Sequence, residues 1–187
     1  KLDNDQIIST IDSNQLTYSI NSLKTDHFIF NEQVFAAYSM YSGKWKKFEY
    51  NAGFRAEQTL SDGQSRSQSL SFTNDYLSFF PSAFIKYPLS KSQDVQLSYS
   101  RRVNRPESRS LNPFTDYSDS LMLRKGNPEL KPEYIHSMEL GYSTQVSNFN
   151  ITATLSYRHT ADLISRYRTV DGNTGMSPAT FINYSTS

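Results

Sequence analysis

Residues 48–60, with the sequence FEYNAGFRAEQTL, decide the fold class of this chain. The even positions carry Phe48, Tyr50 and Phe54 with alanines between them, whereas the odd positions carry charged, polar or small residues. In a β-strand successive side chains point to opposite faces, so an alternation with a period of two separates the two sets. This stretch therefore predicts a strand with one apolar face and one polar face.

The same alternation recurs in residues 95–99, 138–142 and 149–157. Four further stretches are weaker strand candidates, of which two carry apolar residues on both faces and one of those two contains Pro81 and Pro88. These candidates are residues 16–20, 34–42, 79–89 and 181–184. Together the patterns predict about eight strands.

The composition excludes several classes of protein. The chain has 187 residues, a length typical of one domain, with 19 Lys and Arg against 18 Asp and Glu and no Cys. Balanced charge gives no basic surface for nucleic acid, and the lack of Cys excludes disulfides and thiolate metal sites. With 36% hydrophobic and 14% aromatic residues, the chain is unlike a disordered segment or a helical bundle, and sheet is favoured.

No apolar stretch approaches the roughly 18 residues that a membrane-spanning helix needs. Residues 1–5 lack the apolar region of a signal peptide, which says nothing about the full gene product. A membrane role therefore requires spanning strands, whose hydropathy signal is weak.

The predicted connections alternate in length. Residues 42–46, 89–93 and 146–148 form short connections, whereas 61–75, 104–133 and 171–179 form long ones. Tight turns at one end of a meander and long loops at the other are the layout of an outer-membrane barrel. The predicted fold is all-β, an antiparallel up-and-down meander of about eight strands that forms part of a larger transmembrane β-barrel.

A soluble sandwich or barrel also alternates apolar and polar residues. Glu49, Arg55 and Glu57 on one strand face favour the membrane barrel, because charges line a wet lumen there while the apolar face meets lipid. By the same alternation, four residues are candidates for the lumen: Glu49, Arg55, Glu57 and Arg158.

Several motifs in this order resemble one family of proteins. Residues 126–133 (GNPELKPE), followed by 138–142 (MELGY), resemble the signature late in the barrel of TonB-dependent outer-membrane receptors. The stretches that are similar to the outer-membrane barrel family typical of Bacteroidetes are 52–57 (AGFRAE), 97–106 (LSYSRRVNRP), 111–114 (LNPF) and 157–164 (YRHTADLI). The likeness runs from about Phe30 to the end of the chain.

This resemblance implies a transporter in the bacterial outer membrane. Such a receptor binds a scarce nutrient through extracellular loops and an N-terminal plug, and its energy comes from the inner-membrane proton gradient through TonB. The implied partners are outer-membrane lipid and lipopolysaccharide, a plug domain of the same parent chain, the TonB complex acting through that plug, and a surface lipoprotein. No cofactor is expected.

Residues 1–187 are expected to be a single, incomplete segment of such a barrel without its plug, since plugged transporters have about 22 strands. Two other readings stay open. One is a structural or adhesive outer-membrane barrel that does not transport, and the other is a soluble all-β binding module.

The resemblance assigns a structural or loop role to a set of motif residues. Their functional readings are contact with ligand, plug or lipopolysaccharide phosphates, and the plainer reading is a solvated loop held by internal ion pairs. The prolines favour a shaped loop, because each restricts the residue before it. The set is Arg101, Arg102, Arg105, Pro106, Asn112, Pro113, Gly126, Asn127, Pro128, Leu130, Lys131, Pro132, Glu133, Glu139 and Gly141.

Enzyme chemistry finds little support in the sequence. His27, His136 and His159 lie in separate segments and lack the spacing of a helical metal site. A hydrolase reading would join His159 with Asp162 and a nearby serine. Residues 171–175 have the oxygen ligands of a calcium loop but lack the closing acidic residue, so a turn is favoured. We expect no enzyme activity, no catalytic residues and no metal site.

Overall fold

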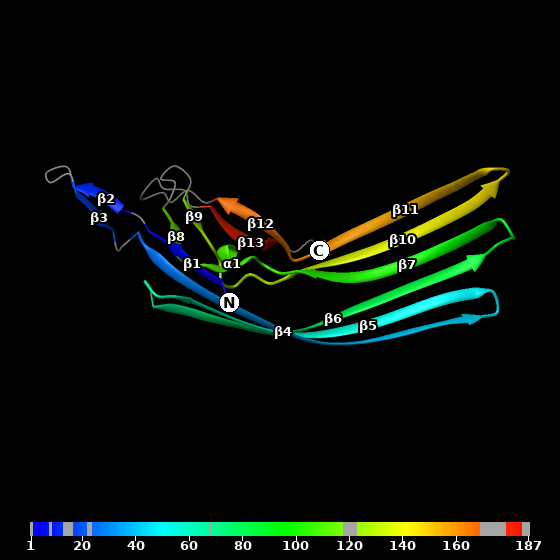
Figure 1. Ribbon diagram of the computed structural model, residues 1–187, viewed down its shortest axis with the longest axis horizontal. Helices are drawn as coiled ribbons and strands as arrows, with labels where there is room; N and C mark the ends of the chain where they lie inside the picture. Colours follow the sequence, from blue (N-terminus) through cyan, green and yellow to red (C-terminus); the bar gives the residue numbers. More distant parts are fainter. Residues whose placement is uncertain are drawn as a thin grey trace.

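The computed structural model describes residues 2–7, 9–12, 17–21, 24–67, 69–117, 123–168 and 179–184. Within this part the chain forms strands and one short helix, α1 (Ser108–Leu111) (Figure 1). The strands are β1 (Leu2–Gln6), β2 (Ser9–Asp12), β3 (Thr17–Ile20), β4 (Asp26–Trp45), β5 (Phe48–Ser65), β6 (Leu70–Pro88), β7 (Gln93–Asn104), β8 (Thr115–Asp116), β9 (Arg124–Lys125), β10 (Glu133–Val146), β11 (Phe149–Ala161), β12 (Leu163–Arg168) and β13 (Ala179–Tyr184).

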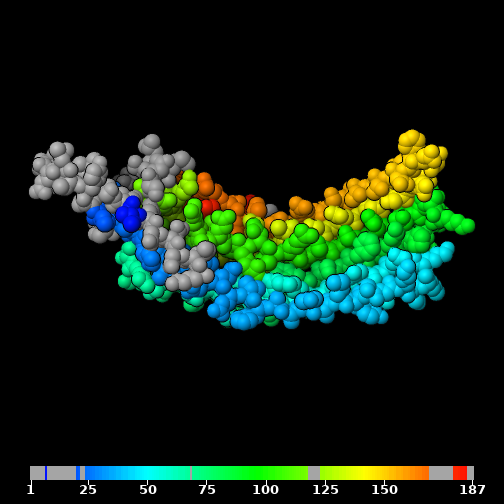
Figure 2. Space-filling view, in the orientation of Figure 1, coloured from blue at the N-terminus to red at the C-terminus, as the bar shows by residue number. Residues whose placement is uncertain are grey.

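Six strands form an antiparallel meander in the order β4, β5, β6, β7, β10 and β11, and β1 pairs with the outer edge of β4. In the space-filling view these strands lie side by side as blue, green and yellow bands along the molecule (Figure 2). The predicted all-β antiparallel meander is confirmed. The strand predicted at 16–20 is described from Thr17 and pairs with β2, and the one at 181–184 lies in β13; both belong to small separate sheets.

The first three strands of the meander are longer than the sequence pattern indicated. The β5–β6 ladder continues to Ser65↔Leu70, so the prediction of a long loop at 61–75 is wrong. The reason is that apolar alternation weakens after Leu60 while backbone pairing continues. A strand outside the lipid layer needs no apolar face, and its ladder hydrogen bonds do not depend on side-chain polarity.

Three tight turns lie together at the right-hand end of Figure 1, between β4 and β5, β6 and β7, and β10 and β11. Two of them hold a non-glycine residue with positive φ, Lys46 at 55° and Ser147 at 54°. Short connections at one end of the sheet are therefore confirmed, but the bounds predicted for the first are wrong: β4 pairs with β5 up to Trp45, so the turn is 46–47 and not 42–46. The predicted turn or calcium loop at 171–175 lies outside the described residues.

The other end of the sheet carries a cluster of loops and short strands, which we call the loop cluster. It comprises α1, β8, β9, β12, β13 and the connections 105–107, 112–114 and 126–132. A small hydrophobic core joins the loop cluster to the sheet: Phe28 and Phe30 of β4 pack with Leu111 and Leu130, and Phe72, Ile164 and Phe181 surround them. Among the described residues, no helix is long and apolar enough to cross a membrane.

Candidate functional site

The strand register gathers the predicted apolar positions on one side of the sheet. Directly opposed residues of an antiparallel pair share a face, and Leu97 lies opposite Ile85 on one side and Leu140 on the other. Leu140 in turn lies opposite Leu155. We call this side, which also carries Phe48, Tyr50 and Phe54, the apolar face. It continues from β4 to β11.

No second layer covers the apolar face within the described part of the chain. Phe149 is 72% exposed and Leu155 is 71% exposed, whereas a soluble sandwich would bury such side chains between two sheets. The apolar positions extend over residues 48–60 of β5 and 149–157 of β11. These lengths match the roughly 9–11 residues with which a tilted strand crosses the hydrocarbon layer. The exposed apolar face therefore favours the membrane barrel over the soluble module.

Aromatic rings gather on the apolar face near the tight turns. Ring centroids lie 6.3 Å apart for Trp45 and Phe48, and 4.7 Å apart for Phe48 and Tyr87. Tyr41 and Tyr50 form another pair at 5.9 Å. A belt of aromatic side chains at the edge of an apolar band is typical of the membrane–water interface of barrels.

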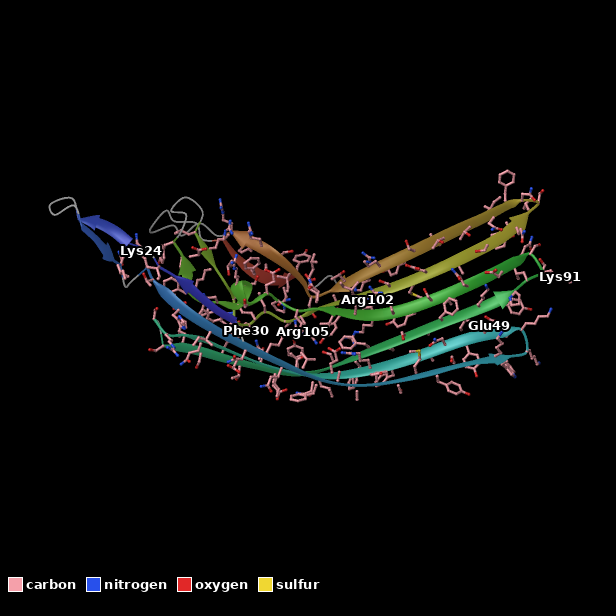
Figure 3. All side chains as sticks on the ribbon, viewed as in Figure 1. Lys24, Phe30, Glu49, Lys91, Arg102 and Arg105 are labelled. Carbon is pink, nitrogen blue, oxygen red and sulfur yellow. The ribbon has the colours of Figure 1, made fainter. Side chains whose placement is uncertain are left out.

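The opposite side, which we call the polar face, carries Glu49, Arg55, Glu57 and, on β11, Arg158. Glu57 is only 6% exposed and accepts hydrogen bonds from Arg55 Nε and Arg105 Nη2. Nearer the tight turns, Lys44 Nζ lies 2.6 Å from a carboxylate oxygen of Glu49. Figure 3 shows Arg105 near the middle of the long strands and Glu49 toward the tight-turn end.

Arg105 lies just beyond β7, yet it reaches back to β5. Its Nη2 atom lies 3.3 Å from Thr59 Oγ1 in addition to bonding Glu57. Although burial lowers the pKa of Arg105, its hydrogen bond to Glu57 and its electrostatic interactions with Tyr76 and Glu57 outweigh that effect and raise the pKa above its ordinary value. An arginine side chain stays protonated in proteins, so Arg105 is a cation that joins the start of the loop to β5.

The polar face also carries large apolar side chains that sequence analysis did not assign to it. Tyr38 is 76% exposed and Met40 is 67% exposed, and together with Phe80 they surround a hollow of about 240 Å³ over Gly53. In the sequence, the feature that could have indicated Tyr38 and Met40 is that residues 34–42 carry apolar residues at both odd and even positions. Without the register, neither set could be assigned to a face.

The ladder between β6 and β7 ends at Ser82↔Ser100, next to Pro81. Beyond this point side-chain contacts of Arg101 and Tyr134 connect β7 and β10 to β6. Arg101 Nη1 donates to the carbonyl oxygen of Phe79 at 3.1 Å, and its guanidinium carbon lies 4.1 Å from the centre of the Tyr134 ring. The Tyr134 hydroxyl lies 2.6 Å from the buried Ser78 Oγ.

Asp26 connects the sheet to the loop cluster. It is 2% exposed and accepts a hydrogen bond from Ser65 Oγ at 2.8 Å, with longer contacts to the Ser67 N–H and to Asn112 Nδ2 at 3.4 Å each. Asn112 Oδ1 in turn accepts from the Phe114 N–H at 3.0 Å. The buried carboxylate therefore joins β4, the end of β5 and the loop cluster.

The GNPEL part of the motif is fixed by backbone hydrogen bonds. The Gly126 N–H donates to the Asn112 carbonyl at 2.9 Å, and the Asn127 N–H donates to the Ser110 carbonyl at 2.7 Å. Asn127 also donates through Nδ2 to the Phe181 carbonyl at 3.1 Å. A Cβ on Gly126 would lie 2.5 Å from the Asn112 carbonyl oxygen, so this close approach requires glycine.

Glu133, at the start of β10, is buried and accepts hydrogen bonds from Asn104 Nδ2 at 2.7 Å and from the Ile164 N–H at 2.6 Å. Asn183 accepts from the Lys131 N–H at 2.8 Å and donates to the carbonyls of Lys131 and Asp162. These contacts are those of a fixed loop in which backbone groups are satisfied locally.

The other motif residues are distributed between wall and loop. Leu130, Pro113 and Pro132 are buried in the loop cluster, and Pro106 and Pro128 are half-buried there. Arg102 is exposed on β7. Glu139 and Gly141 lie on the polar face of β10, opposite Ser98 and Gln96. The motif thus does not converge on a single point.

The fold brings two of the three histidines together and leaves His27 apart. His159 lies opposite His136 on the apolar side, with ring centroids 6.3 Å apart, and His136 Nδ1 lies 2.9 Å from the Tyr99 hydroxyl. His27 lies in β4, at the far end of the sheet. Within the described ranges, no group of three or more His, Cys, Asp or Glu could hold a metal ion.

Comparison with solved structures finds the same fold in nutrient receptors. The siderophore receptor PirA from Pseudomonas aeruginosa superposes with a TM-score of 0.54 at 15% identity, over 90% of this chain and 43% of that protein. The copper transporter OprC gives 0.59 at 13% identity, over 97% and 29%. A mutant of the Pseudomonas aeruginosa ferric enterobactin receptor PfeA, in complex with enterobactin, gives 0.53 at 12% identity, over 98% and 36%. The chain thus spans less than half of each.

A search of curated proteins found no match. The model of the outer membrane protein beta-barrel family matches residues 1–187. This match agrees with the resemblance seen in the sequence and with the exposed apolar face of the meander. The chain therefore belongs to the outer membrane protein beta-barrel family and forms part of the wall of a larger barrel in a bacterial outer membrane.

Proposed function

We propose that this chain is a wall segment, with extracellular loops, of a TonB-dependent receptor that imports a scarce nutrient. The parent protein would close the barrel with further strands and fill it with a plug domain. Outer-membrane lipid and lipopolysaccharide would surround the apolar face, and TonB would act through the plug. A surface lipoprotein is a further proposed partner over the loops.

The observation that carries this proposal is the composition of the polar face. A water-filled channel would favour polar side chains, yet Tyr38 and Met40 are exposed there beside the Arg55, Glu57 and Arg105 network. Exposed large apolar side chains favour a solid partner that covers them. A plug inside the barrel would cover them, with Arg158 and Glu49 as further contact residues.

The solved proteins with this fold support the same function. Their names describe a siderophore receptor, a copper transporter and a ferric enterobactin receptor. Those names give no ligand for this chain, but each describes a receptor or transporter of a nutrient.

The proposal can be tested by deleting the parent gene and measuring uptake of radiolabelled ferric siderophores, cobalamin, copper and oligosaccharides. We expect uptake of one nutrient to be lost, and lost equally when TonB is deleted. Unchanged uptake of every nutrient, together with impaired attachment of the cells to surfaces, would instead support the adhesive barrel.

Contact with a plug can be tested separately in the parent protein, to which residues 1–187 contribute no cysteine. A benzophenone attached at Tyr38→Cys should crosslink to the plug of the same polypeptide. The matched control, Leu155→Cys on the apolar face, should react with lipid. Crosslinking of both positions to lipid would contradict a plugged lumen.

A further inference from the structure

The N-terminal part of β6 has an open edge within the sheet. β5 pairs with β6 along 70–86, whereas β7 pairs only with 82–88. Residues 70–81 therefore have one hydrogen-bonded neighbour, and we call their other side the open edge. Both neighbouring strands belong to this chain, so the opening does not depend on the strands that complete the barrel.

Pro81 explains where the ladder ends. The carbonyl of Phe79 points to the open edge, since it accepts from Arg101 of β7. Backbone groups of alternate residues point to the same side of a strand, so odd residues direct theirs to this edge. The next backbone N–H that β6 would donate to β7 is at position 81. Proline has no N–H, so the ladder stops there.

Four residues that precede Pro81 in the strand direct their backbone N–H and C=O groups to the open edge: Ser71, Thr73, Asp75 and Leu77. Within the described part of the chain, no strand pairs with them on this side. Such a row of free groups is a template for an added strand.

The open edge borders a cavity. It has a volume of about 700 Å³, within the range of ligand pockets, and no residue of β5 lines it. One wall is the run 70–74 of β6, and the other is Pro113, Thr180 and 125–129 of the loop cluster. Hydrogen bonds of Gly126 and Asn127 hold the second wall, so the cavity is bounded by fixed backbone on both sides.

We propose that this cavity binds an oligopeptide in an extended conformation, which adds a strand to the open edge of β6. Free backbone groups at a strand repeat specify a polypeptide, because only another backbone matches their spacing. Lys125 and Glu129 supply one cation and one anion on the opposite wall, which complements the two terminal charges of a short peptide. The proposal rests on the proposed function and gives the receptor its substrate class.

The test uses the full-length parent receptor in lipid nanodiscs, with a tryptic digest of casein as the probe. Retained peptides are identified by mass spectrometry. Each is then synthesised in two forms, one with N-methyl groups on its odd-numbered residues and one with N-methyl groups on its even-numbered residues. We expect one methylated form to lose affinity by about tenfold or more per lost hydrogen bond and the other to bind normally. Equal binding of both forms, or no retained peptide, would overturn the proposal.

Thr73→Pro provides the matching change in the protein. It removes an N–H from the open edge without removing a donor to β5, and should weaken binding about tenfold. Methylated peptides are tested on the unaltered receptor, so the result stands even if the proline variant misfolds.

The outcomes separate this proposal from the proposed function. Peptide binding without peptide uptake in cells would leave the strand-addition site intact and refute import. Uptake of a different nutrient, with no peptide bound, would leave import intact and refute the site.

Discussion

Glu57 and Arg105 lie 48 positions apart in the sequence and are joined by a hydrogen bond on the polar face. Arg55 bonds the other carboxylate oxygen of Glu57. One carboxylate thus accepts from two guanidinium groups, one on its own strand and one at the start of the long loop. This arrangement attaches the loop to the wall at a point two strands away from the end of β7.

Replacing the carboxylate should loosen this attachment. In Glu57→Gln the two arginines lose their anion, and we expect the free energy of unfolding to fall by about 1.5–3 kcal/mol, the range for hydrogen bonds to charged groups. A double-mutant cycle with Arg105→Gln, read by unfolding in detergent, should show coupling above about 0.5 kcal/mol. Strictly additive effects would mean that the contact contributes nothing.

Two glycines of the motif should respond differently to alanine. In Gly126→Ala the new Cβ meets backbone atoms of Asn112 and Ser110 at 2.5–2.7 Å, whereas in Gly141→Ala it meets the flexible side chain of Gln96 at 2.8 Å. Backbone cannot give way as a side chain can, so Gly126→Ala should make the loop sensitive to limited proteolysis. Gly141→Ala should keep it resistant, and the same digestion pattern for both variants would contradict this reading.

Charge on β11 should be tolerated on one face only. Leu155 lies on the apolar face, and its neighbour Ser156 lies on the polar face. Leu155→Arg should cost about 2–4 kcal/mol near the middle of the bilayer, whereas Ser156→Arg should cost little. Heat-modifiable migration on gels, with folding into lipid vesicles, measures both. A larger loss from Ser156→Arg would reverse the assignment of the faces.

The turn between β10 and β11 offers a stabilising change. Val146 lies opposite Phe149, so two residues form the turn, and Ser147 has φ of 54°. Glycine adopts positive φ without steric cost, and Ser147→Gly should therefore raise stability by about 0.5–1 kcal/mol. Asn148, which has no positive φ, is the control: Asn148→Gly should be neutral or destabilising, as seen by thermal unfolding.

The sequence predicted what depends on local periodicity. Alternation around Tyr50, Leu97, Leu140 and Leu155 was enough to place these residues on one face, since each strand reports its own two sides. The tight turns followed from the gaps between alternating stretches. The exposure of that face and the family match then confirm the barrel wall.

Contacts between distant segments could not be read in the same way. The meeting of Asp26, Ser65 and Asn112 depends on a ladder that continues where the side chains are polar, and nothing in that stretch marks it as a strand. The position of Arg105 beside Glu57 likewise depends on register across β5, β6 and β7. Periodicity assigns faces, but it carries no information about register.

The length of the β5–β6 hairpin has a consequence outside the barrel. β4, β5 and β6 have 20, 18 and 19 residues, which at about 3.3 Å each gives roughly 60 Å of strand. A tilt of about 40° leaves some 45 Å of height, against an apolar band about 25 Å tall. In the proposed receptor, the tip would stand well clear of the bilayer on the cell surface, where an antibody against it would recognise living bacteria without any need to open them.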